Sequence, residues 1–288
     1  RLFFSKCAEG EAISLARGME AERPGLQARF TTARSEGLAE ITDYQRAAVY
    51  AGSMAQSHTP TQSLLRQAIS TCIENGGRLL QESYDLEFRS PSSSRYFIVT
   101  IAQEEFAKAF LLLLIDEDII SFDAEVQRAM RDHACKHLVG MWMDYIILHW
   151  EEFEELEKAI ALDVALGGRL PNDVESAMGI LRYDKIERWK SGGQKHVADP
   201  PYDRSALAVA DGKKDKRKQD ALYVRIGVDG RVVSTPANIT DAETIEEFER
   251  AERYRRFVQD MLAGKEQNYR YEKLLDALRH LFAPPTIA

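Results

Sequence analysis

Two apolar stretches of the sequence carry charged and titratable side chains in patterns that could do acid–base chemistry. The first is residues 103–108 (QEEFAK), and the second is residues 128–137 (RAMRDHACKH). Burial of an unpaired charge is costly, so charged residues within core-like sequence are expected either to be paired or to serve a function. The candidate functional residues therefore lie in these two stretches.

The second stretch combines imidazole and guanidinium groups. His133 and His137 lie four residues apart, on one face of a helix, and Arg131 precedes them. A histidine can move a proton near neutral pH, and an arginine can stabilise the charge that builds up on a phosphorane oxygen. Such groups suffice for metal-independent RNA cleavage, in which the ribose 2′-hydroxyl attacks the neighbouring phosphate, provided that they face an open cleft.

Two choices of arginine and histidine could form the catalytic pair, and the sequence does not decide between them. Arg131 with His137 is one choice, and Arg128 with His133 is a second. In a straight helix Arg131 and His137 lie about 120° apart around the axis. They would meet at one phosphate only through side-chain reach, a helix that begins between them, or a dimer partner.

The first stretch allows a structural and a chemical interpretation. Lys108 follows Glu104 by four residues and Glu105 by three, so either carboxylate could neutralise it on a helix. Such a pair could clamp two helices in register or take part in chemistry. A metal bound by His133 and His137 together with Glu104 or Glu105 is a third arrangement that the sequence allows.

The composition favours a soluble globular protein. Of the 288 residues, 44% are hydrophobic and 29% charged, and the net charge of -8 argues against a broad nucleic-acid-coating surface while allowing a local basic site. The longest apolar run, residues 106–115, is shorter than the roughly 20 residues that cross a bilayer. Cys7, Cys72 and Cys135 lie far apart, which favours reduced thiols. We therefore expect a cytoplasmic protein without cofactor, metal or membrane contact.

The apolar periodicity predicts a mainly α protein in four parts. These parts are an N-terminal helical extension (1–57), a helical bundle core (58–190), a flexible basic loop (191–219), and a β-hairpin with C-terminal helices packed on the core (220–288). Within the core, one long helix is expected to begin near residue 121 and to continue through residue 150. The two candidate stretches then lie on neighbouring core helices.

Two features outside the core have specific interpretations. Residues 213–218 (KKDKRK) could contact RNA phosphates, although simple solubility also explains a basic surface loop. Asp229-Gly230 lies between two short alternating runs and predicts a two-residue hairpin turn. The single small hairpin near the C-terminal third must pack on helices, because an isolated hairpin is only marginally stable.

The sequence resembles the abortive-infection V (AbiV) family, a HEPN-related group of bacterial phage-defence proteins. Residues 131–137 are similar to the Arg-x(4–6)-His signature of HEPN ribonucleases, including a polar residue after the arginine. The likeness spans roughly residues 61–241. Its further motifs are Arg95-Tyr96, residues 102–108, residues 133–136, residues 222–224, Pro236 and Ile239-Thr240.

This resemblance implies a HEPN-like helical bundle that pairs as a homodimer, with the arginine and histidine sites at a shared cleft. It also implies a role in halting phage multiplication, by attacking RNA or by blocking translation. RNA, a second copy of the chain and a phage-encoded activator protein are the expected partners. The implied catalytic residues are Arg131, His137 and His133, supported by Asp132, Lys136, Arg128, Glu104, Glu105 and Lys108.

A non-catalytic sensor or scaffold is the alternative, because some HEPN proteins are not active nucleases. Such a protein would bind a phage protein or a translation-associated protein. An open groove beside the charged residues would favour the nuclease. A cluster that is sealed from water, with each cation paired to a carboxylate, would favour the scaffold.

Overall fold

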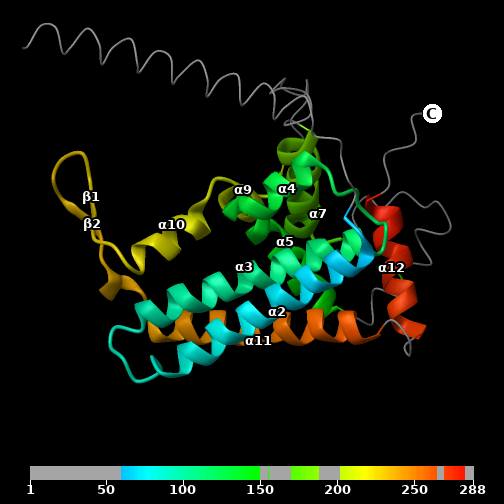
Figure 1. Ribbon diagram of the computed structural model, residues 1–288. Helices are drawn as coiled ribbons and strands as arrows, with labels where there is room; N and C mark the ends of the chain where they lie inside the picture. Colours follow the sequence, from blue (N-terminus) through cyan, green and yellow to red (C-terminus); the bar gives the residue numbers. More distant parts are fainter. Residues whose placement is uncertain (1–59, 150–154, 156–169, 188–201, 265–268, 283–288) are drawn as a thin grey trace, which may run out of the picture. The chain divides into compact units, whose positions relative to one another are not determined.

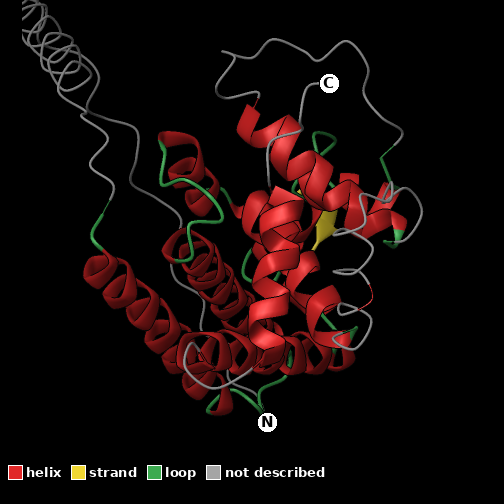
Figure 2. Ribbon diagram, turned by 90° about the vertical axis from the view of Figure 1, so that its right-hand side faces the viewer, coloured by secondary structure: helices red, strands yellow, loops and turns green. Residues whose placement is uncertain are grey.

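The computed structural model describes residues 60–149, 155, 170–187, 202–264 and 269–282. All of them belong to one compact unit, residues 59–288. The predicted N-terminal extension, residues 1–57, lies outside the described residues. Within this unit the fold is mainly α, with a single small β-hairpin among the described residues, as the sequence predicted (Figures 1 and 2).

Three long helices lie side by side and form the centre of the bundle (Figure 1). They are α2 (Gln62–Tyr84), α3 (Ser93–Asp116) and α11 (Asp241–Ala263). The middle helix, α3, is apolar and buried around most of its circumference, which is the pattern of a helix enclosed by others. Its neighbours bury one face each. The charged residues of α3 therefore enter the interior with it.

The helix predicted from residue 121 through residue 150 is instead divided in two, and that prediction is wrong. The helix α4 (Ala124–Arg131) ends at Asp132, and α5 (His133–Leu148) begins directly after it. Asp132 has an extended backbone (ψ 124°), and its side chain accepts a hydrogen bond from the Cys135 amide at 3.1 Å. An aspartate in this position caps a new helix rather than continuing an old one. Arg131 and His137 consequently lie on different helices.

The second half of the unit adds short helices around α5. The helix α7 (Asn172–Gly179) continues into the π-helical η1 (Ile180–Glu187), and α9 (Arg204–Ala210) and α10 (Lys213–Asp220) follow. The prediction of a flexible loop over residues 191–219 is wrong for residues 204–219, which form these last two helices. Lys218, within the basic run, is only 3% exposed, and its ammonium group donates a hydrogen bond to the buried carboxylate of Glu104.

The predicted hairpin is formed by β1 (Arg225–Ile226) and β2 (Val232–Ser234), which pair antiparallel and extend away from the helices (Figure 1). The expectation that the hairpin packs on the helices is wrong for most of its length, since Ile226, Val228, Val232 and Val233 are all exposed. Gly230 has a positive φ of 79° in its turn, a conformation that favours glycine. The 3-10 helix η2 (Pro236–Asn238) leads into α11, and α12 (Tyr269–Phe282) closes the described chain. None of the described helices is both long and apolar enough to cross a lipid bilayer.

Close packing of α2 on α3 gives a direct test of the core. A Cβ atom added to Gly76 would lie 2.5 Å from the Phe106 ring, whereas one added to Gly77 would meet nothing within 4 Å. Phe106 is fully buried. We therefore expect Gly76→Ala to lower the free energy of unfolding by about 2 kcal/mol.

The matched control is Gly77→Ala, which should raise the free energy of unfolding by about 0.5–1 kcal/mol, because alanine is the better helix former. Urea unfolding measures both variants. Equal effects of the two substitutions would contradict the packing of α3 against α2.

Candidate functional site

A single buried carboxylate joins three helices. Glu104, on α3, is 2% exposed. Its oxygens accept hydrogen bonds from Lys136 of α5 and from Lys218 of α10, each at 2.6 Å. His133, the first residue of α5, places Nδ1 2.7 Å from the same carboxylate. We call these residues, together with His137 and Asp215, the Glu104 centre.

Glu104 is ionised at neutral pH. Burial alone would raise the pKa of its carboxyl group, but the hydrogen bonds and positive charges of Lys136 and Lys218 outweigh burial and lower the pKa to about 2. Asp215 of α10 adds a second carboxylate, 2.7 Å from the ammonium nitrogen of Lys218. The two buried ammonium groups are therefore balanced by two carboxylates.

His133 is the accessible imidazole of the centre, since 48% of its side chain is exposed. Nδ1 of His133 lies 2.7 Å from Oε2 of Glu104 and 3.1 Å from the ammonium nitrogen of Lys218. Glu104 is ionised and can only accept, so the shorter contact favours the tautomer in which Nδ1 carries the proton and donates it. In neutral His133 the other ring nitrogen, Nε2, is then an acceptor. A fixed tautomer with a free acceptor nitrogen is the state that a general base needs.

His137 lies one turn further along α5 in a different environment. Its side chain is 3% exposed. Among the described residues its Nε2 has no hydrogen-bond partner, although Oε1 of Glu104 is 3.5 Å away. Burial and the positive charge of Lys214 lower the pKa of His137 to about 3 against the opposing effect of Glu104. His137 is therefore neutral at pH 7.

The structure separates the predicted site residues into three groups. Glu104, His133, Lys136 and His137 are together in the Glu104 centre. Arg128 and Arg131 are exposed on α4, where Arg128 pairs with Glu125 at 3.8 Å, and in the described chain no hydrogen bond or ion pair joins Arg131 to His137. The remaining residues have local roles: Asp132 caps α5, and Glu105 pairs with Lys108 at 2.6 Å, away from Glu104.

The sequence analysis missed the contribution of α10 and a second carboxylate centre. Glu247 of α11 accepts hydrogen bonds from Gln103 at 2.8 Å and from Arg250 at 2.5 Å, and the ammonium of Lys214 lies 3.3 Å away. Burial would raise the pKa of Glu247, but Lys214 and Arg250 lower it to about 2. We call these four residues the Glu247 centre. The four-residue spacing of Lys214 and Lys218 was a signal for one helix face.

The metal site that the sequence allowed takes a different form. Among the described residues, possible metal-ligand atoms lie within 4.8 Å of one another in Glu104, His133 and Asp215. Neither His137 nor Glu105 belongs to this set. The ammonium nitrogen of Lys218 already lies 2.6 Å from Glu104, 3.1 Å from His133 and 2.7 Å from Asp215. A charged Lys218 thus occupies the position that a metal ion would take.

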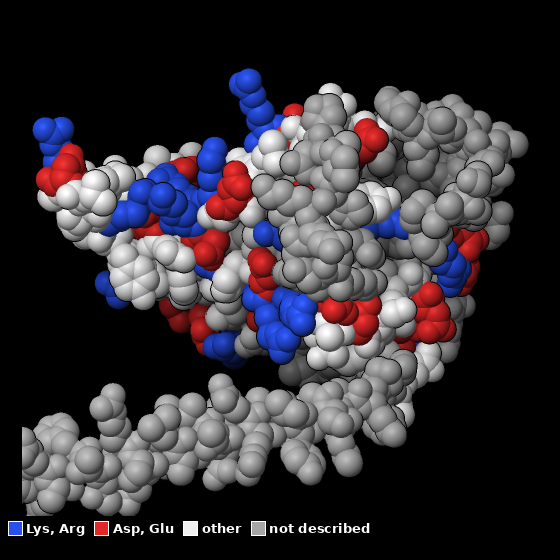
Figure 3. Space-filling view, turned by 90° about the horizontal axis from the view of Figure 1, so that it is seen from above, with Lys and Arg blue, Asp and Glu red and all other residues white. Residues whose placement is uncertain are grey.

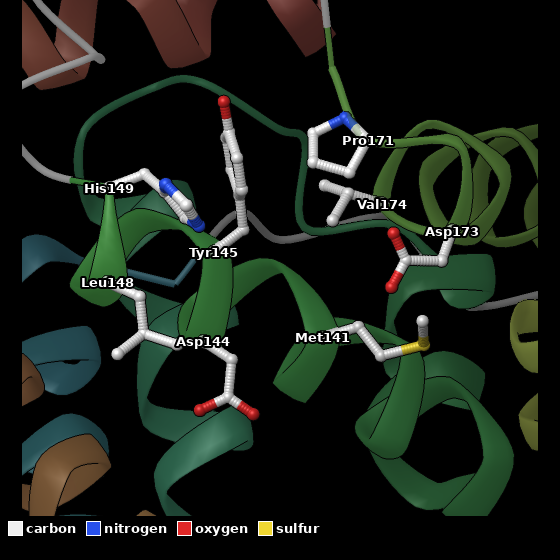
Figure 4. Close-up of a pocket in the computed structure, with 8 residues that line it drawn as sticks. All are labelled: Met141, Asp144, Tyr145, Leu148, His149, Pro171, Asp173 and Val174. Atoms are coloured by element: carbon white, nitrogen blue, oxygen red, sulfur yellow. The ribbon is translucent and has the colours of Figure 1, made fainter.

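A pocket of about 310 Å³ lies elsewhere, beside the C-terminal half of α5 and the start of α7 (Figure 4). Its lining includes Asp144, Tyr145, His149 and Asp173. Tyr145 and His149 stack with ring centroids 5.0 Å apart. No member of the Glu104 centre lines this pocket.

On the outer surface, lysine and arginine side chains gather over α10 beside the hairpin, with acidic side chains among them (Figure 3). Lys213 and Lys216 are the exposed lysines of this helix, whereas Lys218 is buried. The helix therefore has a basic outer face and an inner face whose cations are neutralised.

The fold and its charged interior define a HEPN-like helical bundle. Comparison with models of known protein families matches residues 64–256 to the HEPN_AbiV family, described as AbiV. This match spans more than half of the 288 residues, and the chain belongs to the AbiV family. No curated protein and no solved structure matches the chain.

Removal of the Glu104 charge should destabilise the bundle strongly. Glu104→Gln leaves the ammonium groups of Lys136 and Lys218 buried without their shared carboxylate, so we expect a loss of about 3–5 kcal/mol in the free energy of unfolding. The control Glu105→Gln breaks a more exposed pair and should cost at most about 1 kcal/mol. Urea unfolding that gives similar losses for both variants would contradict the central position of Glu104.

Acid should destabilise the protein partly through His137. Its pKa falls from 6.5 to about 3 on folding, so the unfolded chain binds the proton first as the pH drops. The contribution of His137 to the free energy of unfolding is fully present above pH 6.5 and is lost as the pH falls toward 3. From pH 7 to pH 5 this single group accounts for a loss of about 2 kcal/mol.

The variant His137→Gln lacks this titration and should lose correspondingly less stability over the same pH interval. Urea midpoints at the two pH values, for wild type and variant, measure the difference. An identical pH dependence of both proteins would show that His137 titrates normally in the folded state.

Proposed function

We propose that this protein acts in abortive infection as a metal-independent endoribonuclease, with His133 as the group that moves the proton. The observation that carries the proposal is the half-exposed imidazole of His133 held through Nδ1 by a buried, ionised Glu104. Membership of the AbiV family supports the role in defence. RNA is then the expected substrate.

The chemistry follows from the positions of the exposed groups. Nε2 of His133 takes the proton from the ribose 2′-hydroxyl, the 2′-oxygen attacks phosphorus, and the bond to the 5′-oxygen breaks. Arg128 and Arg131, exposed on the helix that ends just before His133, supply positive charge for the phosphate oxygens. A homodimer would bring a second copy of the site, whose imidazolium can protonate the leaving 5′-oxygen.

Of the two arginine–histidine pairs in the sequence, this proposal favours Arg128 with His133 over Arg131 with His137. His133 is exposed and oriented, whereas His137 is buried and has a pKa of about 3. An acid–base catalyst must reach the substrate and change its protonation state near the working pH. In the arrangement described here, His137 meets neither requirement.

The burial of Lys136 and His137 favours a second candidate function, a non-catalytic sensor or scaffold. Glu104 satisfies both Lys136 and Lys218, so these cations brace α3, α5 and α10 and are not offered to a phosphate. In that case the exposed surface would bind a phage protein or a translation-associated protein.

Cleavage of labelled RNA in the presence of EDTA tests the nuclease. We expect wild type to cut, His133→Ala to lose at least about 100-fold in rate, and Arg128→Ala and Arg131→Ala to lose at least about tenfold. The control Arg231→Ala changes an exposed arginine on the hairpin and should cut as wild type does.

Full activity of His133→Ala would remove this residue from the chemistry. Thermal unfolding of each variant separates chemistry from folding. The exposed Arg128 and Arg131 variants should leave the free energy of unfolding within about 0.5 kcal/mol, whereas His133→Ala also removes the contact with Glu104 and should cost about 1.5–3 kcal/mol while the protein stays folded. Protection from phage that survives in His133→Ala, with no RNA cleavage by wild type, would support the scaffold.

A further inference from the structure

The helix α10 is held on the bundle almost entirely through charge. Its sequence, KKDKRKQD, contains no apolar side chain. Lys214 lies 3.3 Å from Glu247, Arg217 donates to Glu243 at 2.7 Å, and Lys218 donates to Glu104 at 2.6 Å. Ordinary surface helices dock through an apolar stripe. This helix docks through three cations on carboxylates of α3 and α11.

Docking of this kind provides little net stability. The desolvation of buried charges offsets most of their mutual attraction, and exposed pairs contribute at most about 1 kcal/mol each.

The two ends of α10 are held differently. The helix begins directly after Gly212, whose φ of 77° lies in the left-handed region. Ala221, at its other end, is buried in a small apolar cluster with Tyr96 and Ile239. One end of α10 is thus anchored by apolar contacts, and the other follows a glycine.

If α10 were released, Glu104 and Glu247 would each still have a cation beside them. Glu104 would keep the hydrogen bonds to Lys136 and His133, and Glu247 would keep those to Arg250 and Gln103. The large penalty for stranding a buried charge is therefore avoided. The bundle of α2, α3, α5 and α11 retains its own apolar core without α10, since this helix contributes no side chain to the main apolar cluster.

His137 lies next to the contact between α10 and Glu104: Oε1 of Glu104 is 3.5 Å from Nε2 of His137 and accepts a hydrogen bond from Lys218 of α10 at 2.6 Å. Three residues of α10, namely Lys214, Lys218 and Asp215, act on it electrostatically. Its Nε2 is buried and without a hydrogen-bond partner among the described residues. An unsatisfied buried ring nitrogen costs free energy, and access to water would remove that cost.

We infer that α10 is a displaceable cover over His137 and Glu104, held by the ion pairs of Lys214, Arg217 and Lys218. With the cover in place, His133 is the only imidazole of the Glu104 centre that solvent reaches. With the cover released, His137 joins it, four residues away on the same helix. Two neighbouring imidazoles then face one exposed site. This inference concerns access to His137 and does not rest on RNA cleavage.

Chemical modification of the histidines tests the cover directly. The double variant Lys214→Gln/Lys218→Gln removes two of the ion pairs, and Lys213→Gln/Lys216→Gln is the matched control, with the same change in charge on the exposed face of the same helix. Each protein is treated with diethyl pyrocarbonate, and the modification of His137 and His133 is followed by mass spectrometry. Amide hydrogen exchange is measured in α10 and, for comparison, in α3.

The inference predicts that His137 is modified at least about tenfold faster in Lys214→Gln/Lys218→Gln than in wild type, with a similar rise in amide exchange over α10 alone. His133, already exposed, serves as the internal standard and should change by less than about twofold. The control variant should match wild type.

Unchanged protection of His137 in Lys214→Gln/Lys218→Gln would overturn the inference. It would show that α10 stays in place without these ion pairs. An equal rise in exchange across α3 and α10 would also overturn it, because α10 would then be an integral part of the bundle and not a separable cover. Neither outcome depends on whether the protein cuts RNA.

Discussion

The structure depends on one electrostatic constraint: a carboxylate placed inside an apolar helix must be neutralised by cations from its neighbours. Glu104 is on α3, the most enclosed helix of the bundle, and cannot reach water. Its partners come from α5 and from α10, which lie in separate parts of the sequence. Each of these helices therefore meets α3 at a charged contact. The apolar core makes the helices pack, and Glu104 specifies which residues face one another.

The same constraint makes two histidines of one helix face chemically different. His133 starts α5 and keeps half of its side chain exposed, while its Nδ1 is held by Glu104. His137, one turn later, is enclosed by the bundle and by α10 and remains neutral. Proximity in sequence therefore does not give the two imidazoles the same role. Burial is the main cause of the lowered pKa of His137, and the positive charge of Lys214 adds to it.

Much of the fold could be predicted from the sequence, because the relevant signals are local. Apolar periodicity predicted a mainly α bundle, and Asp229-Gly230 predicted the hairpin turn. The break at Asp132 was missed because α4 and α5 both have helical patterns, and only the capping hydrogen bond to Cys135 distinguishes two helices from one. The helix α10 was missed because it has no apolar residue and hence no apolar periodicity, and because the carboxylates that its cations meet lie on distant helices.

The candidate site shows the same division between local and long-range information. The resemblance to the AbiV family placed Glu104, Lys136 and the two histidines in one set of site residues, without saying which of them are paired. The sequence also offered Glu104 and Glu105 as alternative partners of Lys108, because both pairings are local. In the structure Lys108 pairs with Glu105, and Glu104 selects Lys136 and Lys218. A choice among partners 32 and 114 residues away depends on the tertiary arrangement, which local spacing does not contain.

The ionisation of Glu104 is the most direct measure of this account. Carbon-13 NMR of protein labelled in its glutamate side-chain carboxyl groups, with Glu104 assigned by substitution, follows that carboxyl group as the pH falls. The two buried ammonium groups should hold its pKa to about 2, so that the signal remains that of a carboxylate through pH 3 or until the protein unfolds. A Glu104 signal that titrates in the folded protein at or above the ordinary value of 4.5 would contradict the account, because burial would then outweigh the cations.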